Sequence, residues 1–308
     1  FKGYRPSSRY PNLESENIET LFKDKENLIW IGTKGGGLSM LNPTKNEIVN
    51  FNEIFVTQIG KKPRIVSINQ DSKGNIWIGT WSSGLFVINP KENTLERYLS
   101  FNSPVYQILC DKLGNMWFIV GKTLYKFDFL ENRIINHDTD ITLYNMIEDT
   151  LRKKIWLTGN KGESIELRNF DYYTQKIRSN NVSLTGRYAK SIAIDVRGRI
   201  WIGSWGNGLY ISDENIERFD KVNTSPTSKV EKNVNYSFIT DIFIDKNNIG
   251  WLSTAYGGVL ILHPNKGFDW LQDNDEQQGY DKNIIAIFED SKKNLYKGTL
   301  TEGLYVKK

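Results

Sequence analysis

The sequence predicts an all-β protein, a seven-bladed β-propeller with four antiparallel strands per blade. An aspartate slot followed by a tryptophan slot recurs through the whole chain, successive copies lie 39 to 50 residues apart, and no stretch shows a convincing helical period. A repeat of this length fits a propeller blade and is too long for leucine-rich or ankyrin units. We expect residues 1–308 to form one propeller domain. Its blades are centred on Trp30, Trp77, Trp117, Trp156, Trp201, Trp251 and Tyr296.

Each copy contains four short strand signals. In the second copy, Ile65–Ile68 and Ile76–Ile78 are rich in β-branched and aromatic residues and are bounded by turn residues. A third strand follows a glycine turn at Gly84–Ile88, and a fourth follows an Asn-Pro turn at Thr94–Tyr98. Repetition of such a unit around a ring leaves only short sheet edges exposed.

The last copy lacks a fourth strand, because the chain stops at Lys308 soon after the third. The N-terminal segment Phe1–Arg5 precedes the first copy, where the outer strand of a preceding blade would lie. We therefore expect residues 1–5 to pair with residues 303–307, which ties the first blade to the last and removes two open edges.

The most regular slots of the repeat are interpreted as scaffold. The aspartates stand where the first strand enters its turn, and aspartate there accepts hydrogen bonds from backbone amides two residues on. They are therefore expected to hold turns and no metal ion. The tryptophans are expected to fill the wedge between neighbouring sheets, and the Gly-Thr or Gly-Ser pair after them to let strands approach closely. The aspartate slot comprises Asp24, Asp71, Asp111, Asp149, Asp195, Asp245 and Asp290.

Composition excludes several classes of partner. A net charge of +4, from 40 basic and 36 acidic residues spread along the chain, is a mixed surface unlike the basic stripe that nucleic acid needs. The single cysteine, Cys110, allows no intrachain disulfide. No apolar stretch is long enough for a membrane helix, so we expect no direct membrane insertion of this fragment. No cofactor is expected.

The segment Asp71–Leu85 spells the pattern Asp-x-x-Gly-Asn-x-Trp-Ile-Gly-Thr-x-x-x-Gly-Leu, and Asp195–Leu209 nearly repeats it. This pattern resembles the two-component regulator propeller repeat, found in the periplasmic sensor regions of hybrid histidine kinases. It is degraded in the third and fourth copies, where Val120-Gly121 and Gly159-Asn160 replace the Gly-Thr pair. The resemblance implies a periplasmic sensor that responds to glycan breakdown products. It also implies further C-terminal sensor and kinase domains as partners.

Propellers bind ligands on the face formed by the loops between second and third strands and the loops between blades. Trp81 and Trp205 directly follow Gly-Thr and Gly-Ser, outside the core tryptophan slot, and exposed indoles are favoured at binding sites. Alternatively, each covers the end of a neighbouring blade. Polar residues of the first strands, such as Ser67 and Asn145, are expected to bind channel water. The candidate ligand-binding residues are Trp81, Trp205, Tyr256, Arg64, Arg187, Tyr188, Tyr236, Lys34 and Glu302.

Two long loops, residues 220–237 and 267–282, break the rhythm of the repeat. Long loops are either functional or flexible. The second carries aromatic and acidic residues, so it is the better candidate for docking a partner or the other domains. A second copy of the chain, in a homodimer, is also kept among the expected partners.

Catalysis is not expected. The two histidines, His137 and His263, are assigned to the opposite or outer face and cannot form a metal-ligand pair. Glu302 and Asp241 are the only obvious carboxylates on the binding face, and nothing in the sequence brings them together. The expected function is a non-catalytic extracytoplasmic sensor propeller of a two-component signalling protein, which binds a glycan-derived ligand or transmits the signal through domain contacts. The alternatives are a protein–protein interaction scaffold and a lyase acting on a polysaccharide or a streptogramin.

Overall fold

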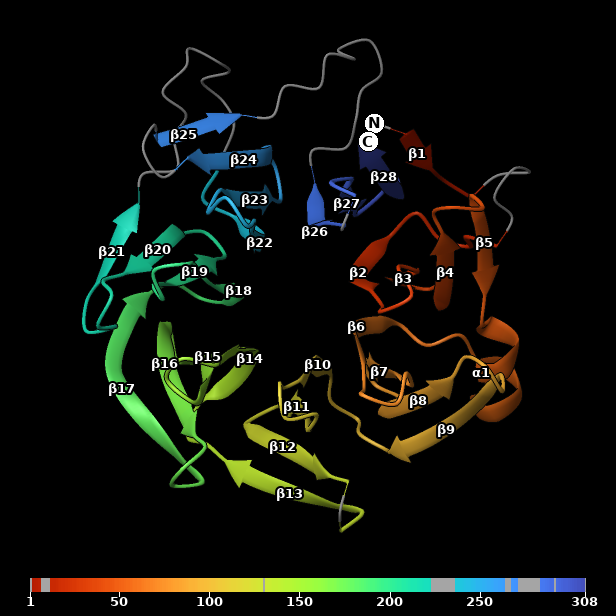
Figure 1. Ribbon diagram of the computed structural model, residues 1–308, viewed down its shortest axis with the longest axis horizontal. Coiled ribbons are helices and arrows are strands. Elements are labelled where there is room, and N and C mark those ends of the chain that lie inside the picture. The colour runs from red at the N-terminus through yellow and green to blue at the C-terminus, as the bar shows by residue number, and fades with distance from the viewer. Residues whose placement is uncertain are drawn as a thin grey trace. The chain divides into compact units, whose positions relative to one another are not determined.

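The computed structural model describes residues 2–6, 12–129, 131–222, 236–263, 267–270, 283–290 and 292–307. They form seven antiparallel sheets of four strands each, the blades of a seven-bladed β-propeller, as the sequence predicted (Figure 1). By packing, the chain divides into two units, Phe1–Asn136 with Phe288–Lys308, and His137–Ile287. The single domain over residues 1–308 stays a prediction.

The first unit contains blades 1 to 3, and in each the strands follow one another in chain order. Blade 1 consists of β2 (Ile18–Lys23), β3 (Ile29–Thr33), β4 (Leu38–Asn42) and β5 (Glu47–Asn50). Blade 2 consists of β6 (Ile65–Gln70), β7 (Ile76–Thr80), β8 (Leu85–Asn89) and β9 (Thr94–Leu99). Blade 3 consists of β10 (Val105–Cys110), β11 (Met116–Val120), β12 (Thr123–Asp128) and β13 (Arg133–Asp138).

The second unit contains blades 4 to 6, with the same strand order. Blade 4 consists of β14 (Thr142–Asp149), β15 (Lys154–Lys161), β16 (Ser164–Asp171) and β17 (Lys176–Thr185). Blade 5 consists of β18 (Ala189–Ile194), β19 (Ile200–Ser204), β20 (Gly208–Ser212) and β21 (Phe219–Val222). Blade 6 consists of β22 (Ile239–Ile244), β23 (Gly250–Thr254), β24 (Gly258–His263) and β25 (Gly267–Trp270).

Blade 7 is built from both ends of the chain. Its sheet order is β1-β28-β27-β26, formed by β1 (Lys2–Tyr4), β28 (Leu304–Lys307), β27 (Leu295–Thr299) and β26 (Ile284–Glu289). Lys2 pairs with Val306 and Tyr4 with Leu304, which confirms the predicted N-terminal clasp. The two termini accordingly lie side by side in Figure 1. The Arg5 guanidinium also forms an ion pair with Glu302, next to β28.

The repeated aspartate forms hydrogen bonds with the backbone of its turn and also with the repeated tryptophan. Asp71 Oδ1 accepts hydrogen bonds from the amides of Lys73 and Asn75, both at 2.9 Å, as predicted. Its Oδ2 accepts the indole N–H of Trp77 at 3.0 Å, a bond that the sequence did not reveal. Blade 7 keeps the arrangement with tyrosine, whose hydroxyl donates to the aspartate. The same bond is made by the pairs Asp24–Trp30, Asp111–Trp117, Asp149–Trp156, Asp195–Trp201 and Asp290–Tyr296.

Several of these rings also pack into the next blade. Trp30 belongs to a cluster with Ile65, Ile76 and Phe86 of blade 2, and Trp77 to a cluster with Phe118 of blade 3. The expectation that this slot fills the wedge between sheets is therefore confirmed. One side chain thus pins its own turn through its polar atom and fills the joint between two sheets with its apolar surface.

The glycine after the tryptophan lies where the first strand of the next blade passes. A Cβ on Gly32 would come within 2.6 Å of Ile65 Cγ2, and one on Gly79 within 2.7 Å of the Val105 carbonyl oxygen. Real Cβ atoms do not approach other atoms so closely, so only glycine fits. The predicted close approach is confirmed.

Polar side chains of the first strands also join neighbouring blades. The Ser67 hydroxyl donates to the Val105 carbonyl at 2.8 Å, and the Asn145 amide donates to the Ala189 carbonyl at 2.7 Å. These two residues were expected to bind channel water. They bond instead to the backbone of the next blade, because each follows an irregularity in strand pairing at the start of its strand.

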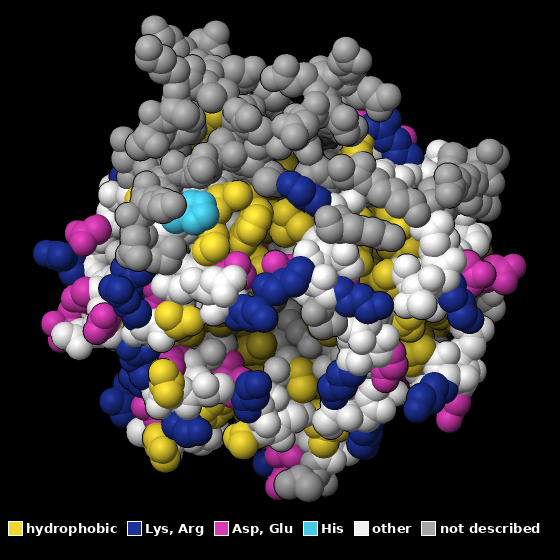
Figure 2. Space-filling view, turned by 45° about the horizontal axis from the view of Figure 1, so that its top comes forward, with side chains coloured by type: hydrophobic (Ala, Val, Ile, Leu, Met, Phe, Trp, Pro, Cys, Tyr) yellow, Lys and Arg dark blue, Asp and Glu magenta, His cyan; other side chains and the backbone are white. Residues whose placement is uncertain are grey.

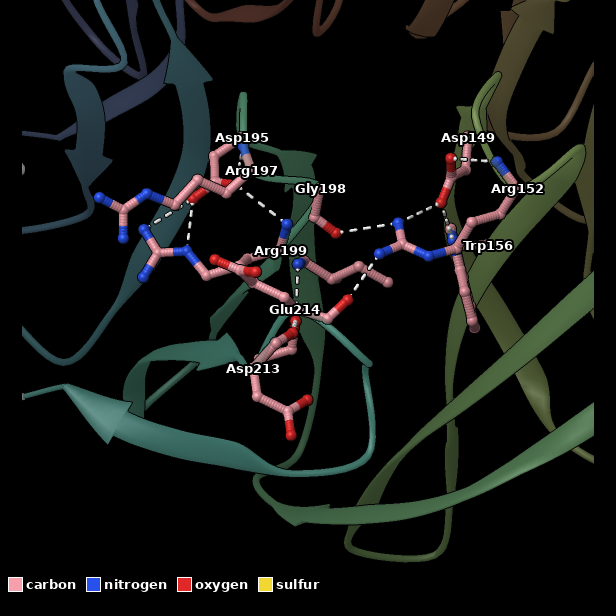
Figure 3. A network of polar contacts seen from close by, with 11 residues as sticks. Asp149, Arg152, Trp156, Asp195, Arg197, Gly198, Arg199, Asp213 and Glu214 are labelled. Atoms are coloured by element: carbon pink, nitrogen blue, oxygen red, sulfur yellow. Dashed lines mark hydrogen bonds and ion pairs between the residues drawn. The ribbon is translucent and has the colours of Figure 1, made fainter.

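A basic residue strengthens one joint inside the second unit (Figure 3). Arg152 donates to the Asp149 carboxylate at 2.8 Å and reaches into blade 5, where it donates to the carbonyls of Gly198 at 3.0 Å and Glu214 at 2.6 Å. Burial alone would raise the pKa of Asp149, but hydrogen bonds from Trp156 and Arg152 outweigh it and lower the pKa. Among the described residues no cation bonds to Asp24 in this way, and burial raises its pKa.

The expectation that the chain has no helical stretch is wrong in one place. Helix α1 (Asn52–Ile59) lies between blades 1 and 2, and its Phe55 is fully buried against Phe86, with ring centroids 5.4 Å apart. Its sequence contains two isoleucines, a valine and a threonine, which favour strands. Tertiary packing of Phe55 and a left-handed cap at Gly60 (φ 71°) stabilise the helix against this preference.

We expect Asp71→Ala to lower the free energy of unfolding by about 3 kcal/mol, because it leaves several buried donors without an acceptor. Urea unfolding followed by tryptophan fluorescence measures this. Lys73→Ala, at an exposed position of the same turn, is the control and should change stability little. Equal stability of the two variants would contradict the scaffold role of the aspartate.

Candidate functional site

The fold fixes the residues at the tips of the loops by a repeated backbone hydrogen bond. The residue after the Gly-Thr pair donates its N–H to the carbonyl of the residue that precedes the first strand. Trp81 donates to Arg64 at 3.0 Å, and Trp205 donates to Tyr188 at 2.9 Å. Each loop-tip tryptophan therefore lies against a residue of the loop between blades. The same bond joins Lys34 to Asn17 and Ala255 to Phe238.

A threonine or serine hydroxyl closes the turn beneath the tips of blades 1, 2, 5, 6 and 7. Thr80 Oγ1 donates to the Gly84 carbonyl at 2.8 Å, and Ser204 Oγ donates to the Gly208 carbonyl at 2.9 Å. In the degraded fourth copy, Asn160 Nδ2 donates to the Ser164 carbonyl at 3.1 Å and takes over this role. The turn geometry therefore survives the loss of the Gly-Thr pair in that blade.

In the first unit, Trp81 is 40% exposed and is stacked by a cation. The Arg64 guanidinium carbon lies 4.1 Å from the indole centroid, and Tyr106 meets the ring edge-on at 6.2 Å. Arg64 is itself held by Glu19 at 2.9 Å. One face of Trp81 is thus occupied by an ion-paired arginine.

In the second unit, five rings from three blades form a set, which we call the aromatic row: Tyr144, Tyr188, Trp205, Phe238 and Tyr256. Three of the four successive pairs are in ring contact. Tyr144 and Tyr188 have centroids 5.6 Å apart, Trp205 and Phe238 5.0 Å, and Phe238 and Tyr256 5.3 Å, all edge to face. Lys190 bridges the remaining step, with Nζ 6.0 Å from the Tyr188 ring and 5.6 Å from the Trp205 ring.

The aromatic row is accessible at several points. Tyr188 is 44% exposed and Tyr256 is 50% exposed, whereas Trp205 and Phe238 are partly buried. A backbone bridge between Trp205 and Phe238 ties the blade 5 tip to blade 6. Rings held this way lose little freedom when a ligand stacks on them, which favours binding.

Three of the predicted site residues belong to the row, namely Trp205, Tyr188 and Tyr256. Arg187 lies beside it in sequence and is 74% exposed, with a 3.7 Å contact to Glu163. Tyr236 is buried and packs in the blade 6 core with Trp201, so the structure does not place it on the accessible part of the row.

The other predicted site residues lie in the first unit. Arg64 and Trp81 stack as described. Lys34 is exposed at the blade 1 tip. Glu302 binds Arg5 and accepts a hydrogen bond from Tyr305 at 2.9 Å, so it forms part of the blade 7 clasp.

Sequence reasoning missed Phe238, Tyr144 and Lys190. Phe238 immediately precedes the first strand of its blade, as Tyr188 and Arg64 precede theirs, so alignment of that slot could have found it. Tyr144 and Lys190 lie near the start of first strands, among residues that otherwise form the core, and no local signal marks them as exposed.

The surface around these loops is mixed in charge. Figure 2 shows basic side chains spread over the described part of one face, with acidic and hydrophobic side chains between them. In blade 4, Asp140 is bound by Lys161 at 2.8 Å and by Arg168 at 3.2 Å. The hydrogen bond from Lys161, joined by that from Arg168, lowers the pKa of Asp140 to about 2.

Histidine and carboxylate chemistry is sparse near the row. The His137 ring packs on Phe170 at 4.9 Å in blade 4, and His263 ends β24. Within the described ranges, no three His, Cys, Asp or Glu side chains gather as a metal site would require. In the same part of the chain, no helix has the length and apolar character to cross a membrane. The two long loops predicted from the sequence, residues 220–237 and 267–282, lie mostly outside the described residues, which omit 223–235 and 271–282.

Residues 60–82, which include the tip of blade 2, match the family described as two component regulator propeller. The chain carries this repeat. The recognition made from the sequence is thus confirmed. No curated protein matches the chain.

Solved structures with the same fold include two from B. thetaiotaomicron. The extracellular domain of a putative hybrid two component system has a TM-score of 0.74 at 19% identity, over 95% of this chain and 40% of its own. That of a putative one component system has a TM-score of 0.75 at 19% identity, over 96% of this chain and 38% of its own. PorZ, a surface component of the type-IX secretion system of Porphyromonas gingivalis, has a TM-score of 0.71 at 18% identity, over 94% of this chain and 46% of its own.

These likenesses establish the propeller fold. The chain spans less than half the length of each of these three proteins, so a repeat propeller of this kind is one part of larger proteins there.

One buried carboxylate in the second unit makes its stability depend on pH. Asp241 accepts hydrogen bonds from the amides of Ile242 at 2.9 Å and Ile287 at 3.1 Å. Although part of the residue is exposed, burial of its carboxylate outweighs these bonds and raises its pKa to about 7. No ion pair to Asp241 is present among the described residues.

Because the folded-state pKa is raised, the protonated form is stabilised by folding, and this contribution is lost as pH rises from about 4 to about 7. We expect the free energy of unfolding of the wild type, relative to Asp241→Asn, to fall by roughly 3 to 4 kcal/mol over that window, at about 1.4 kcal/mol per pKa unit. Urea unfolding at a series of pH values measures it. Parallel curves for the two proteins would contradict the assignment.

Proposed function

We propose that this chain is a non-catalytic sensor propeller of a two-component signalling protein and that it binds a glycan-derived ligand on the aromatic row. The observation that carries the proposal is the set of ring contacts between Tyr144 and Tyr256, in which Lys190 lies near both rings at the one step without a ring contact, from Tyr188 to Trp205. This set lies at loop tips that the fold holds in place.

The chemistry of the row suits a sugar. Aromatic rings offer flat apolar faces to the C–H surfaces of a pyranose, while their polar atoms and neighbouring side chains hold hydroxyls. Tyr188 and Tyr256 present two exposed rings, and Trp205 lies between them in the row. Several stacking positions in series fit an oligosaccharide better than a single small molecule.

The sensor role is supported by the repeat family and by two structural relatives, which are extracellular domains of a putative hybrid two component system and a putative one component system. We place the chain outside the cytoplasm, in the periplasm. Since it spans about 40% of those two proteins, the signal would pass to C-terminal sensor and kinase domains of the same polypeptide.

The second candidate function is a protein-interaction scaffold. It is favoured by the likeness to PorZ, a surface component of a secretion system with the same fold. In that case the exposed rings would meet a protein surface and no oligosaccharide would bind.

We expect Trp205→Ala to weaken oligosaccharide binding at least ten-fold, because it removes the central ring of the row and the support of Phe238. Calorimetric titration of the 308-residue chain with a panel of plant and host oligosaccharides measures this. Tyr173→Ala removes an aromatic residue that is 80% exposed in the turn between β16 and β17, and it should leave binding unchanged.

Trp81→Ala tests whether the stacked tryptophan of the first unit contributes separately. Absence of binding by every member of the panel would favour the scaffold. Binding that Trp205→Ala leaves intact would place the sugar site elsewhere on the chain.

A further inference from the structure

Two basic side chains accompany the aromatic row. Lys190 lies in β18, is exposed, and has its ammonium group near the rings of both Tyr188 and Trp205. Arg187 occupies the loop immediately before Tyr188. A ligand stacked on either ring would bring its substituents beside these two positive charges.

We propose that the aromatic row selects an anionic oligosaccharide, whose carboxylate or sulfate groups bind Lys190 and Arg187. This inference rests on the proposed function and names the ligand class of the same site. It follows from where the cations lie, since a ligand without negative charge would partly desolvate an ammonium group and return no ion pair for it.

Arg187 can exchange its present partner for a ligand. Its contact with Glu163 is 3.7 Å long, and the two side chains are 74% and 85% exposed. Such exposed pairs contribute little, because water screens them and both side chains lose freedom to form them. A ligand carboxylate or sulfate that is already held on the neighbouring rings would compete effectively with Glu163.

Nearby acidic charge is neutralised within blade 4. Asp140, in the loop that enters this blade, is bound by both Lys161 and Arg168. Glu166 binds Arg168 as well, at 3.2 Å. These carboxylates are therefore compensated within the protein and oppose an anionic ligand only weakly.

The stacked tryptophan of the first unit is a different case. Arg64 also lies over an indole there, but Glu19 holds it at 2.9 Å and the two side chains are only 31% and 15% exposed. Its charge is satisfied inside the protein. The row, and not Trp81, is therefore the site where the cations point to an anionic ligand.

An oligosaccharide panel with uronic acid-containing, sulfated and neutral members tests the inference on the 308-residue chain by calorimetry. We expect acidic members to bind. Lys190→Gln and Arg187→Gln should each weaken them about five- to ten-fold, the loss of one charge-assisted hydrogen bond partly screened by water. Glu163→Gln should tighten them two- to three-fold, because it removes the competing carboxylate. Added salt should weaken binding more in the wild type than in Lys190→Gln.

Lys246→Gln is the matched control. Lys246 is exposed in the turn between β22 and β23, at the opposite end of these strands from the blade 6 tip, and its loss changes net charge equally. Binding of neutral members alone, or acidic binding that Lys190→Gln and Arg187→Gln leave unchanged, would overturn this inference and keep the proposed function. Binding of no member would overturn both.

Discussion

The structure depends on the hydrogen bond between an aspartate and the large aromatic residue six or seven positions later. In six of the seven blades, the carboxylate holds the turn between the first two strands with one oxygen and the ring with the other. The ring then fills the gap to the next blade, as Trp77 does against Phe118. A buried carboxylate is costly unless its oxygens are fully used, and here the same bonds that satisfy it also orient the wedge between sheets.

Because these repeated residues hold the scaffold, the residues at the loop tips can vary. In six of the blades, a side chain that donates to a backbone carbonyl closes the turn beneath the tip, and threonine, serine and asparagine all serve. The tip residue is then fixed through its own N–H, whatever its side chain. The scaffold therefore tolerates Lys34, Trp81, Trp205 or Ala255 in one structural position, and the differences among blades accumulate where a ligand can reach them.

The row and the Arg64–Trp81 stack show how the same position acquires different chemistry. Both place a cation over a loop-tip indole, Arg64 over Trp81 and Lys190 over Trp205. Arg64 is compensated by Glu19, whereas Arg187, beside the row, has only a long, exposed contact with Glu163. The two sites differ in how firmly a carboxylate of the protein binds the basic side chain, and not in whether a basic side chain is present. A propeller built from similar blades can in this way differ in chemistry from one part of its surface to another.

The sequence by itself determined the blade count, the strands and the scaffold role of the repeated slots, because each follows from a local pattern repeated seven times. From the missing fourth strand of the last copy it also predicted a clasp between residues 1–5 and 303–307, which the structure shows for residues 2–4 and 304–306. It also pointed to Trp81 and Trp205. Only the tertiary structure showed that Tyr144, Trp205 and Tyr256, from three blades, belong to one row, and that Tyr236 is buried. Only the tertiary structure showed that residues 52–59 form helix α1, where burial of Phe55 overrides a strand-favouring sequence. The physical reason is common to these cases: ring contacts and burial depend on packing between segments distant in the chain, which no local pattern encodes.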